Sequence, residues 1–278
     1  MGLRIATNVQ SLAANRYLML NRAEQDKSLE RLASGSRINH SGDDAAGLAI
    51  SEKLRAQIRS LKQATRNAND GVSLIQVAEG SMNEISNILV RLRELSIQAA
   101  SDTIGDPERG FIDKEVQNLK AEVDRISAST EYNGTKLLNG DDGKALEIQI
   151  GINNNKELDR FIYDTPANKT TTDSLGITDI STISKEQAQQ NLSKLDHAIN
   201  DLNEHRASLG ALENRLHSVI NNMTIYDENL EAANSRIKDT DLAEETSNLT
   251  KENILTQANI AVLSQANQSS MQALKLLG

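Results

Sequence analysis

The chain of 278 residues has no cysteine, no tryptophan and only two prolines, and aromatic residues make up 2% of it. Without cysteine it can form no disulfide, no thiolate metal site and no thiol-based catalytic centre. Aromatic side chains usually supply much of the buried area of a thick core, and proline interrupts helices. The scarcity of both therefore favours long, thin helices over a compact globule.

Charge runs of one sign and long apolar runs are also missing. The formal net charge is −9 and both signs are interspersed, so no stripe of Lys and Arg is suited to nucleic-acid phosphates. No apolar run approaches the roughly 18 residues of a membrane span. Arg4 and Arg16 interrupt the segment where a signal peptide would need its apolar core. We expect no nucleic-acid or membrane partner, and a protein that is either cytosolic or exported without a cleaved signal.

The sequence contains no H-E-x-x-H, no glycine-rich phosphate loop and no G-x-S-x-G motif. His197, His205 and His217 fall on one predicted helix, but without the i, i+4 spacing that lets two histidines hold one ion. The stretch "NGDDGK", 139–144, lacks the alternating acids and distal Glu of a calcium loop, so a hairpin turn is the better interpretation. We predict that the protein is not an enzyme and binds no metal or cofactor.

Helical periodicity dominates what is present. Two long segments, 43–101 and 185–237, each carry one narrow apolar seam, which predicts two rods of similar length packed antiparallel. In the first rod the seam repeats every seventh residue, at Leu54, Leu61, Ala68, Ile75, Met82 and Leu89. In the second it runs through Ala188, Leu192, Leu195, Ile199 and Leu202, then Leu209, Leu212, Leu216, Val219, Met223, Tyr226, Leu230, Ala233 and Ile237.

The two ends of the chain are predicted to be helices that pair with each other, over about 3–33 and 240–278. Their apolar stripes comprise Ile5, Val9, Leu12, Met19 and Ala23, and Leu255, Ala258, Val262, Ala266, Ala273 and Leu276. At about 25 cal/mol per Å² of apolar area, one thin seam barely offsets the roughly 1–2 kcal/mol of backbone entropy lost per residue. We expect these helices to become ordered by packing against other copies of the chain.

The middle of the chain changes period. A shorter amphipathic helix is predicted over 107–128, with Phe111, Val116, Leu119, Val123 and Ile126 on its apolar side. Over 132–165, alternating apolar residues and the turn pairs Asn133-Gly134 and Asn139-Gly140 predict β-hairpins. The fold class is therefore mainly α, with long antiparallel helical rods or coiled coils formed by both chain termini and a small β-hairpin region mid-chain.

The polar stretch "SGSRINHSGDDAAG" separates the first helix from the first rod. Gly35 is expected to end the helix in a left-handed conformation. Ser41 is the expected N-cap of the rod, with Asp43 and Asp44 in its first turn near the positive end of the helix dipole. Together with Gly42, these residues form a predicted joint, which either bends or acts as a fixed connector.

Several stretches together resemble the bacterial flagellin family. They cover both ends and the rods in the family's order: "LRIATNVQSLAANRYL", "RLASGSRINHSGDDAAGLAIS", "NANDGVSLIQVAEGSMNEISNIL", "RELSIQAASDT", "EYNGTKLL" and "SRIKDTDLAEETSNLTKENILTQANIAVLSQANQ". Because "FIYD" is followed almost directly by "SLGITDIS", the chain looks like a minimal member without the variable outer domains of larger flagellins.

The resemblance implies a structural subunit of the flagellar filament, exported unfolded and polymerised at the distal tip. It implies an inner coiled coil of 1–42 with 239–278, and a rod domain over 43–238. Implied partners are other copies of the chain, the flagellar export apparatus with its chaperones, and the filament cap and hook-junction proteins. The implied location is the extracellular filament, with a periplasmic filament left open.

Many flagellins are also recognised by Toll-like receptor 5 through an R-x-R-E-L segment. Arg91, Arg93, Glu94 and Leu95 match this pattern, whereas Val90 stands where glutamine is often found. The resemblance makes Arg91, Glu94 and Leu95 candidate receptor contacts, and the alternative is a solvated helix face. Two other functions stay open from sequence: a hook–filament junction protein and a soluble coiled-coil adaptor.

Overall fold

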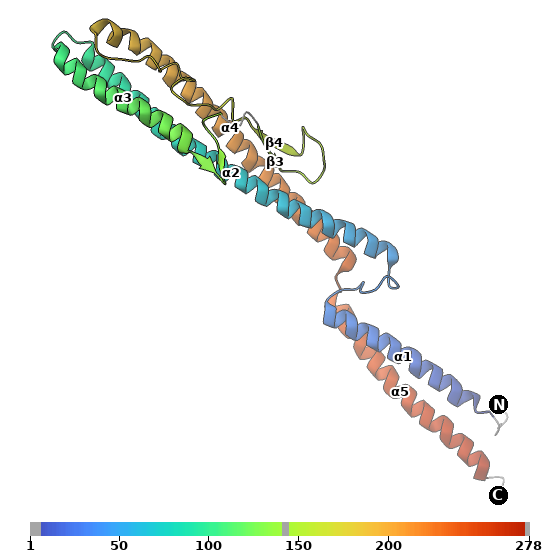
Figure 1. Ribbon diagram of the computed structural model, residues 1–278. Helices are drawn as coiled ribbons and strands as arrows, with labels where there is room; N and C mark the ends of the chain where they lie inside the picture. The colour runs from blue at the N-terminus through green and yellow to red at the C-terminus, as the bar shows by residue number, and fades with distance from the viewer. Residues whose placement is uncertain (1–6, 141–144, 276–278) are drawn as a thin grey trace. The chain divides into compact units, whose positions relative to one another are not determined.

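The computed structural model describes residues 7–140 and 145–275. The chain divides into two compact units, which we call the terminal unit, residues 1–58 with 228–278, and the rod unit, residues 59–227. Figure 1 shows the elements of both. The helices α2 (Ala45–Ala99) and α4 (Lys185–Lys238) each begin in one unit and end in the other. The predicted division of the chain at 42/43 and 238/239 falls inside the terminal unit.

The long helices match the sequence-based prediction closely. α2 begins two residues later and ends two residues earlier than the predicted first rod, and α4 coincides with the second to within one residue. The shorter helix, α3 (Asp106–Ser129), has Pro107 in its first turn, where the missing amide hydrogen costs nothing. These boundaries agree because few proline or glycine residues interrupt the periodic segments.

The rod unit buries the predicted heptad seam. From Leu61 to Leu89 the seventh-residue positions of α2 are all buried, and so are Ala188, Leu195 and Leu202 of α4. α2 and α4 run antiparallel, since Gln76 contacts Glu213 and Arg93 contacts Asp196 across the pair. Side chains of α3 belong to the same core. The rod unit therefore completes a continuous apolar core within one chain.

A buried guanidinium closes the end of α2. Arg109 of α3 donates from Nε to the carbonyl of Ala99 at 2.9 Å and from Nη2 to that of Ser101 at 3.0 Å. Its third partner is the carboxylate of Asp106, which lies on the surface. The last carbonyl groups of a helix have no partner inside the helix, so Arg109 supplies the donors that the end of α2 needs.

Two short hairpins complete the rod unit. β1 (Glu131–Tyr132) pairs with β2 (Thr135–Lys136), and β3 (Leu146–Gln149) pairs with β4 (Arg160–Tyr163). The first turn has positive φ at both Asn133 and Gly134, as a type I′ turn requires. Gly140 is also left-handed, and residues 141–144 of the "NGDDGK" stretch lie outside the described residues. The core face of β4 carries Phe161 and Tyr163, both buried, and burial raises the pKa of the Tyr163 hydroxyl.

Three apolar residues predicted from sequence to face a core do not do so: two lie on helices, and the third, Leu158, was expected in the alternation of the β-hairpin region. Phe111 of α3 is 69% exposed, Leu158 is 75% exposed, and Tyr226 of α4 is also exposed. Leu158 falls in the turn before β4 begins and is not in strand alternation. At the lower end of the α4 seam the half-buried Asp227 forms an ion pair with Lys62 instead.

The segment from 164 to 184 leads from β4 directly to α4 and is bound to α3. The carboxylate of Asp124 accepts hydrogen bonds from the amide and hydroxyl of Thr172, and that of Asp113 accepts from the amide of Thr182 and the hydroxyl of Ser181. No further domain interrupts this part of the described chain. The sequence-based expectation of a minimal rod is consistent with this direct connection.

The terminal unit pairs α1 (Val9–Ser34) with α5 (Leu242–Lys275). Asn8 caps α1 by accepting from the amide of Ser11, so the helix begins after residue 8, later than the predicted start at residue 3. Asp241 caps α5 through the amides of Ala243 and Glu244. The pair is antiparallel, as Figure 1 shows.

Candidate assembly surface

The contact between α1 and α5 is made largely by small and polar side chains. On α1 the buried residues are Ala14, Leu18 and Ser28. Polar groups cross the contact, because Asn8 donates to the carbonyl of Ala266 at 2.9 Å and Gln25 donates to Asn253 at 2.6 Å. A contact of this kind buries little apolar area, so hydrophobic burial contributes little to its stability.

The large apolar side chains of both helices lie on exposed surface instead. Met19 is 70% exposed and Leu12 is 61% exposed. Six such residues lie on α1 and six on α5: Val9, Leu12, Tyr17, Met19, Leu20 and Leu29, and Leu242, Ile254, Leu255, Ile260, Val262 and Met271. A monomer seldom leaves a contiguous apolar surface uncovered unless another molecule binds there.

This arrangement locates the apolar stripe that the sequence predicts for the first helix. The stripe of Val9, Leu12, Met19 and Ala23 has helical spacing, and these positions lie in α1, but they do not face α5. At about 100° per residue, Leu12 lies roughly 160° around the helix from Ala14 and Met19 lies roughly 140° from it. The predicted pairing of the two terminal helices is confirmed, but this stripe does not form the contact between them. Ile5 and Leu276 lie outside the described residues.

The joint between α1 and α2, residues 35–44, is tied to the connection between α4 and α5. Gly35 has φ 68°, as predicted for a residue that ends a helix. Its carbonyl accepts from the amide of Thr240 at 3.0 Å, and the amide of Arg37 donates to the carbonyl of Lys238 at 2.6 Å. Ser36 and Asp239 form an isolated antiparallel bridge. These bonds favour the fixed connector over the bending spacer.

Asp44, and not Ser41, caps α2. The Asp44 side chain accepts from the amide of Gly47 at 2.8 Å, the third residue of the helix, as an N-cap does. Ser41 is exposed in the preceding turn, and Gly42 in the same turn has open space around it and no left-handed φ. The predicted cap was therefore three residues too early, and Gly42 has no conformational need to be glycine.

Asp43 holds the joint in place electrostatically. One carboxylate oxygen accepts from the amides of Asn39 and His40, and the other forms an ion pair with Lys27 of α1 at 3.2 Å. The amide of His40, followed by Lys27 and the amide of Asn39, lowers the pKa of Asp43 from 3.8 to about 2. The carboxylate therefore links the joint to α1 at neutral pH.

A close contact missed from sequence lies just behind the joint. Ile38 is buried, and a Cβ added at Gly47 of α2 would stand 2.8 Å from the Cδ1 of Ile38 and 2.4 Å from a carboxylate oxygen of Asp44. Gly47 thus provides the space for both the cap and the buried isoleucine. The pattern "RINHSGDDAAG" contains the signal, because an apolar residue stands alone in a polar turn before a glycine in the first turn of a helix.

The candidate receptor residues do not form one surface. Arg91 and Glu94 are exposed and joined at 3.1 Å, and Arg91 also reaches Glu115 of α3 at 2.9 Å. Leu95, by contrast, is 2% exposed and belongs to the core of the rod unit. Its assignment as a receptor contact is corrected, because α3 covers that side of α2. The partner Glu115 was not predicted.

Neither a metal centre nor a membrane segment is found in the described ranges. His197, His205 and His217 all lie on α4, as predicted. Within residues 7–140 and 145–275 no group of three His, Cys, Asp or Glu side chains could hold a metal ion. No helix among those residues is long and apolar enough to cross a membrane.

The chain is thus a mainly helical protein with a complete core in its rod unit and exposed large apolar side chains on both helices of its terminal unit. Residues 5–142 match the family described as the bacterial flagellin N-terminal helical region, and residues 192–277 match the bacterial flagellin C-terminal helical region. Flagellin of Halalkalibacterium halodurans is 43% identical over 272 residues, which cover 97% of this chain and 98% of that protein. The chain belongs to the bacterial flagellin family.

Two further relatives agree. Flagellin of Bacillus subtilis is 41% identical over 308 residues, covering 99% of this chain and all of that one. The crystal structure of Bacillus cereus flagellin aligns with a TM-score of 0.50 and 33% identity, over 57% of this chain and 88% of that one. The recognised family and the mainly helical fold with two small hairpins were therefore both predicted correctly from sequence.

Proposed function

We propose that this chain is the structural subunit of a bacterial flagellar filament, and that it polymerises through the exposed apolar faces of α1 and α5. One observation carries the proposal: the paired helices leave twelve large apolar residues exposed, while mainly small and polar residues, together with Leu18, fill the contact between them. The inner layer of the proposed filament is formed by 1–42 and 239–278, and the rod by 43–238. The family and the names of the relatives, which include flagellar filament core proteins, support the same role.

The energetics favour assembly over a stable monomeric pair. Full burial of a large apolar side chain stabilises by about 1.5–3 kcal/mol, and the twelve uncovered residues on α1 and α5 are 39–70% exposed. Covering each of them in a polymer is worth about 1 kcal/mol. A subunit surrounded by several copies gains this contribution many times over, which can offset the entropy of ordering two long helices.

Truncation tests the proposal directly. Removal of residues 240–278 deletes α5, so we expect polymerisation seeded with filament fragments to be abolished. The rod helices should remain folded, because their core lies within residues 59–227. Electron microscopy measures the first effect and circular dichroism the second. Filaments that form from the truncated chain would contradict the proposal, and wild-type chain that stays a folded dimer at all concentrations would favour a coiled-coil adaptor.

The proposal extends to the route and the place of assembly. The chain is exported unfolded by the flagellar export apparatus with its chaperones, and it adds to an extracellular filament between the hook-junction proteins and the cap. Membership of the flagellin family supports this route. Protease added to intact cells should cut an external filament. Protection that ends only when the outer membrane is opened would indicate a periplasmic filament instead.

Recognition by Toll-like receptor 5 is a separate part of the proposal. Its surface is the exposed cluster of Arg91 and Glu94 on α2 with Glu115 on α3. A receptor reporter assay with soluble monomer should lose signal for Arg91→Glu. Arg59→Glu serves as the matched control. Arg59 is exposed on α2, and no ion pair is found for it among the described residues. An equal signal from Arg91→Glu and wild type would remove this part of the proposal.

A further inference from the structure

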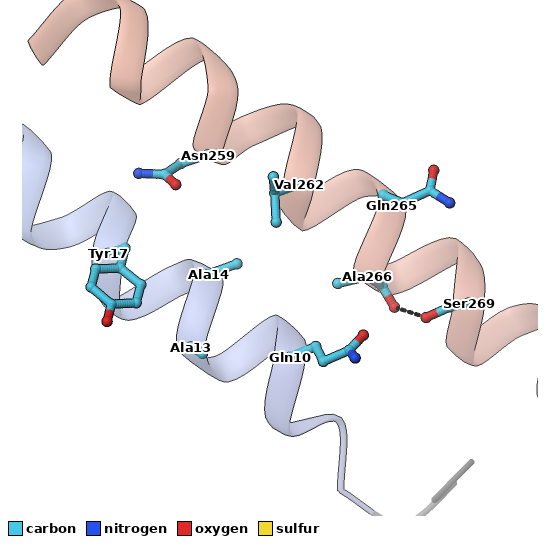
Figure 2. Close-up of a pocket in the computed structure, with 9 residues that line it drawn as sticks. All are labelled: Gln10, Ala13, Ala14, Tyr17, Asn259, Val262, Gln265, Ala266 and Ser269. Atoms are coloured by element: carbon cyan, nitrogen blue, oxygen red, sulfur yellow. Dashed lines mark hydrogen bonds between the residues drawn. The ribbon is translucent and has the colours of Figure 1, made fainter. Parts of the chain in front are cut away.

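A groove lies along one side of the α1–α5 pair. It has a volume of about 580 Å³. It is lined by Ala13, Ala14 and Tyr17 of α1 and by Val262 and Ala266 of α5, and Figure 2 shows Ala14 pointing toward α5. The alanines leave the space that larger side chains would fill, and amide side chains stand at the edges. The groove is therefore shaped to receive apolar side chains from outside the pair.

A ridge of large apolar side chains lies on a different side of α1. It consists of Leu12 and Met19, which are both exposed. At about 100° per residue, Ala13 lies roughly 100° from the contact with α5, whereas Leu12 and Met19 lie roughly 140–160° from it in the opposite sense. The groove and the ridge are thus two distinct surfaces of one helix pair.

The charge pattern of α5 indicates that the occupant is another copy of this chain. Residues 253–274 contain no Asp, Glu, Lys or Arg, although most of this stretch that has a described exposure is solvent-accessible. A helix exposed to water ordinarily carries charges on its outer side. If other copies of the chain cover this helix, its side chains become buried between subunits, where an unpaired charge is costly. A charge-free helix avoids that cost, and amide side chains can still form hydrogen bonds between copies.

The shapes of the two surfaces decide how the copies meet. A self-complementary contact would place groove against groove, leaving the space unfilled, or ridge against ridge, leaving the groove open. When the ridge of one copy sits in the groove of another, the groove is filled and the ridge is covered. Such a contact joins two different patches, and repeated head-to-tail contacts of this type generate an open helical polymer unless the rotation closes a ring.

We propose that the groove of Ala13, Ala14, Val262 and Ala266 in one copy receives the Leu12–Met19 ridge of α1 from a neighbouring copy. The inference rests on the proposed filament function and adds the pair of surfaces that meet. Leu12 and Met19 are seven residues apart, so they lie about two turns from each other along the ridge. The length of the groove, from Gln10 to Tyr17 on α1, matches that span.

Cysteine cross-linking tests the pairing, and the chain has no native cysteine to interfere. The double variant Ala13→Cys with Met19→Cys carries one thiol in the groove and one on the ridge. Within one copy these positions are about 9 Å apart along the helix axis, too far for a disulfide. Mild oxidation of assembled filaments should therefore give a ladder of covalent dimers, trimers and longer species on a denaturing gel.

The single variants and one shifted pair are the controls. Ala13→Cys alone and Met19→Cys alone should stay monomeric on the gel. The pair Asn15→Cys with Met19→Cys moves the first thiol out of the groove to the ridge side of α1, one turn from Met19, and should give no ladder. Dimers from Ala13→Cys alone would show that grooves meet grooves and would overturn the inference. The absence of a ladder in well-formed filaments of the double variant would also overturn it.

Filling the groove provides a second, independent test. Ala13→Phe should raise the concentration needed for seeded polymerisation at least tenfold, whereas Ala13→Ser, which leaves the groove open, should change it less than about threefold. Equal effects of the two variants would overturn the inference even where the cross-linking variants assemble poorly. If wild-type chain forms no filaments at all, the proposed function fails. Normal wild-type filaments with no effect from Ala13→Phe refute only the pairing of groove and ridge.

Discussion

Leu89 on α2 of the rod unit is fully buried, whereas Met19 on α1 of the terminal unit is 70% exposed. Both belong to apolar stripes with helical spacing, and both would be assigned to a core from sequence. The two stripes differ in the elements that pack against them. The rod unit has three helices and two hairpins that share one core, while α1 packs on α5 mainly through small and polar side chains. Apolar periodicity therefore identifies a surface to be buried, but it does not say whether the same chain buries it.

The largest expected effect separates the two units most directly. Leu89→Ala removes a fully buried side chain and leaves a cavity, so we expect the free energy of unfolding of the soluble subunit to fall by about 2–5 kcal/mol. Met19→Ala in the same subunit should change it by less than about 0.5 kcal/mol. Urea denaturation followed by circular dichroism measures both. Comparable losses from the two variants would mean that Met19 is already buried within the monomer.

In filament assembly we expect the opposite order, with the larger effect from Met19→Ala. If a neighbouring copy covers Met19, loss of about 1 kcal/mol of contact corresponds to about a fivefold rise in the concentration needed for polymerisation. Sedimentation of filaments against total protein measures this concentration. A variant of Met19 that assembles like wild type would place this side chain outside the contacts between subunits.

The next effect tests how the rod unit closes its own end. Arg109→Met leaves the carbonyls of Ala99 and Ser101 without their buried donor, so we expect a loss of about 2–3 kcal/mol in the free energy of unfolding of the rod unit. Asp106→Asn is the matched control, because this partner of Arg109 is exposed and such a pair contributes less than about 1 kcal/mol. A stable Arg109→Met variant would show that water satisfies these carbonyls.

Particular residues show how far sequence reasoning reached. The seam from Leu61 to Leu89 was predictable because a seven-residue repeat admits one buried face. Leu95 was misassigned to the surface because α3 packs on a second side of α2, and a two-helix repeat carries no sign of a third helix. Likewise, Ser41, Asp43 and Asp44 are all acceptable N-cap types. The choice of Asp44 depends on Asp43 being held by Lys27, a contact between segments 16 residues apart that only the folded chain brings together.

A smaller effect is expected at the joint, where backbone hydrogen bonds link residues 35–37 to residues 238–240. Gly35 is left-handed, and an alanine there should cost about 1–2 kcal/mol. Gly42→Ala should change little, because its surroundings are open and its φ is ordinary. Hydrogen exchange of assembled filaments, followed by mass spectrometry, should show faster exchange at the amides of Arg37 and Thr240 for Gly35→Ala only. If both variants changed the curvature of the filament, the joint would be a bending spacer instead.

The smallest expected effect is the pH dependence of the same joint. The folded pKa of Asp43, about 2, lies below its ordinary value of 3.8, so its contribution to stability is fully present above about pH 4 and is lost as the pH falls through about 2. Other carboxylates titrate in this range, and comparison with Asp43→Asn isolates the one group. The difference in exchange at the amides of Asn39 and His40 between wild-type and variant filaments should therefore shrink from pH 4 to pH 2. A difference that stays constant over this window would mean that the ion pair with Lys27 and the two amide bonds do not hold the joint. The contacts of Gly35 with Thr240 and of Arg37 with Lys238 would then hold it without them.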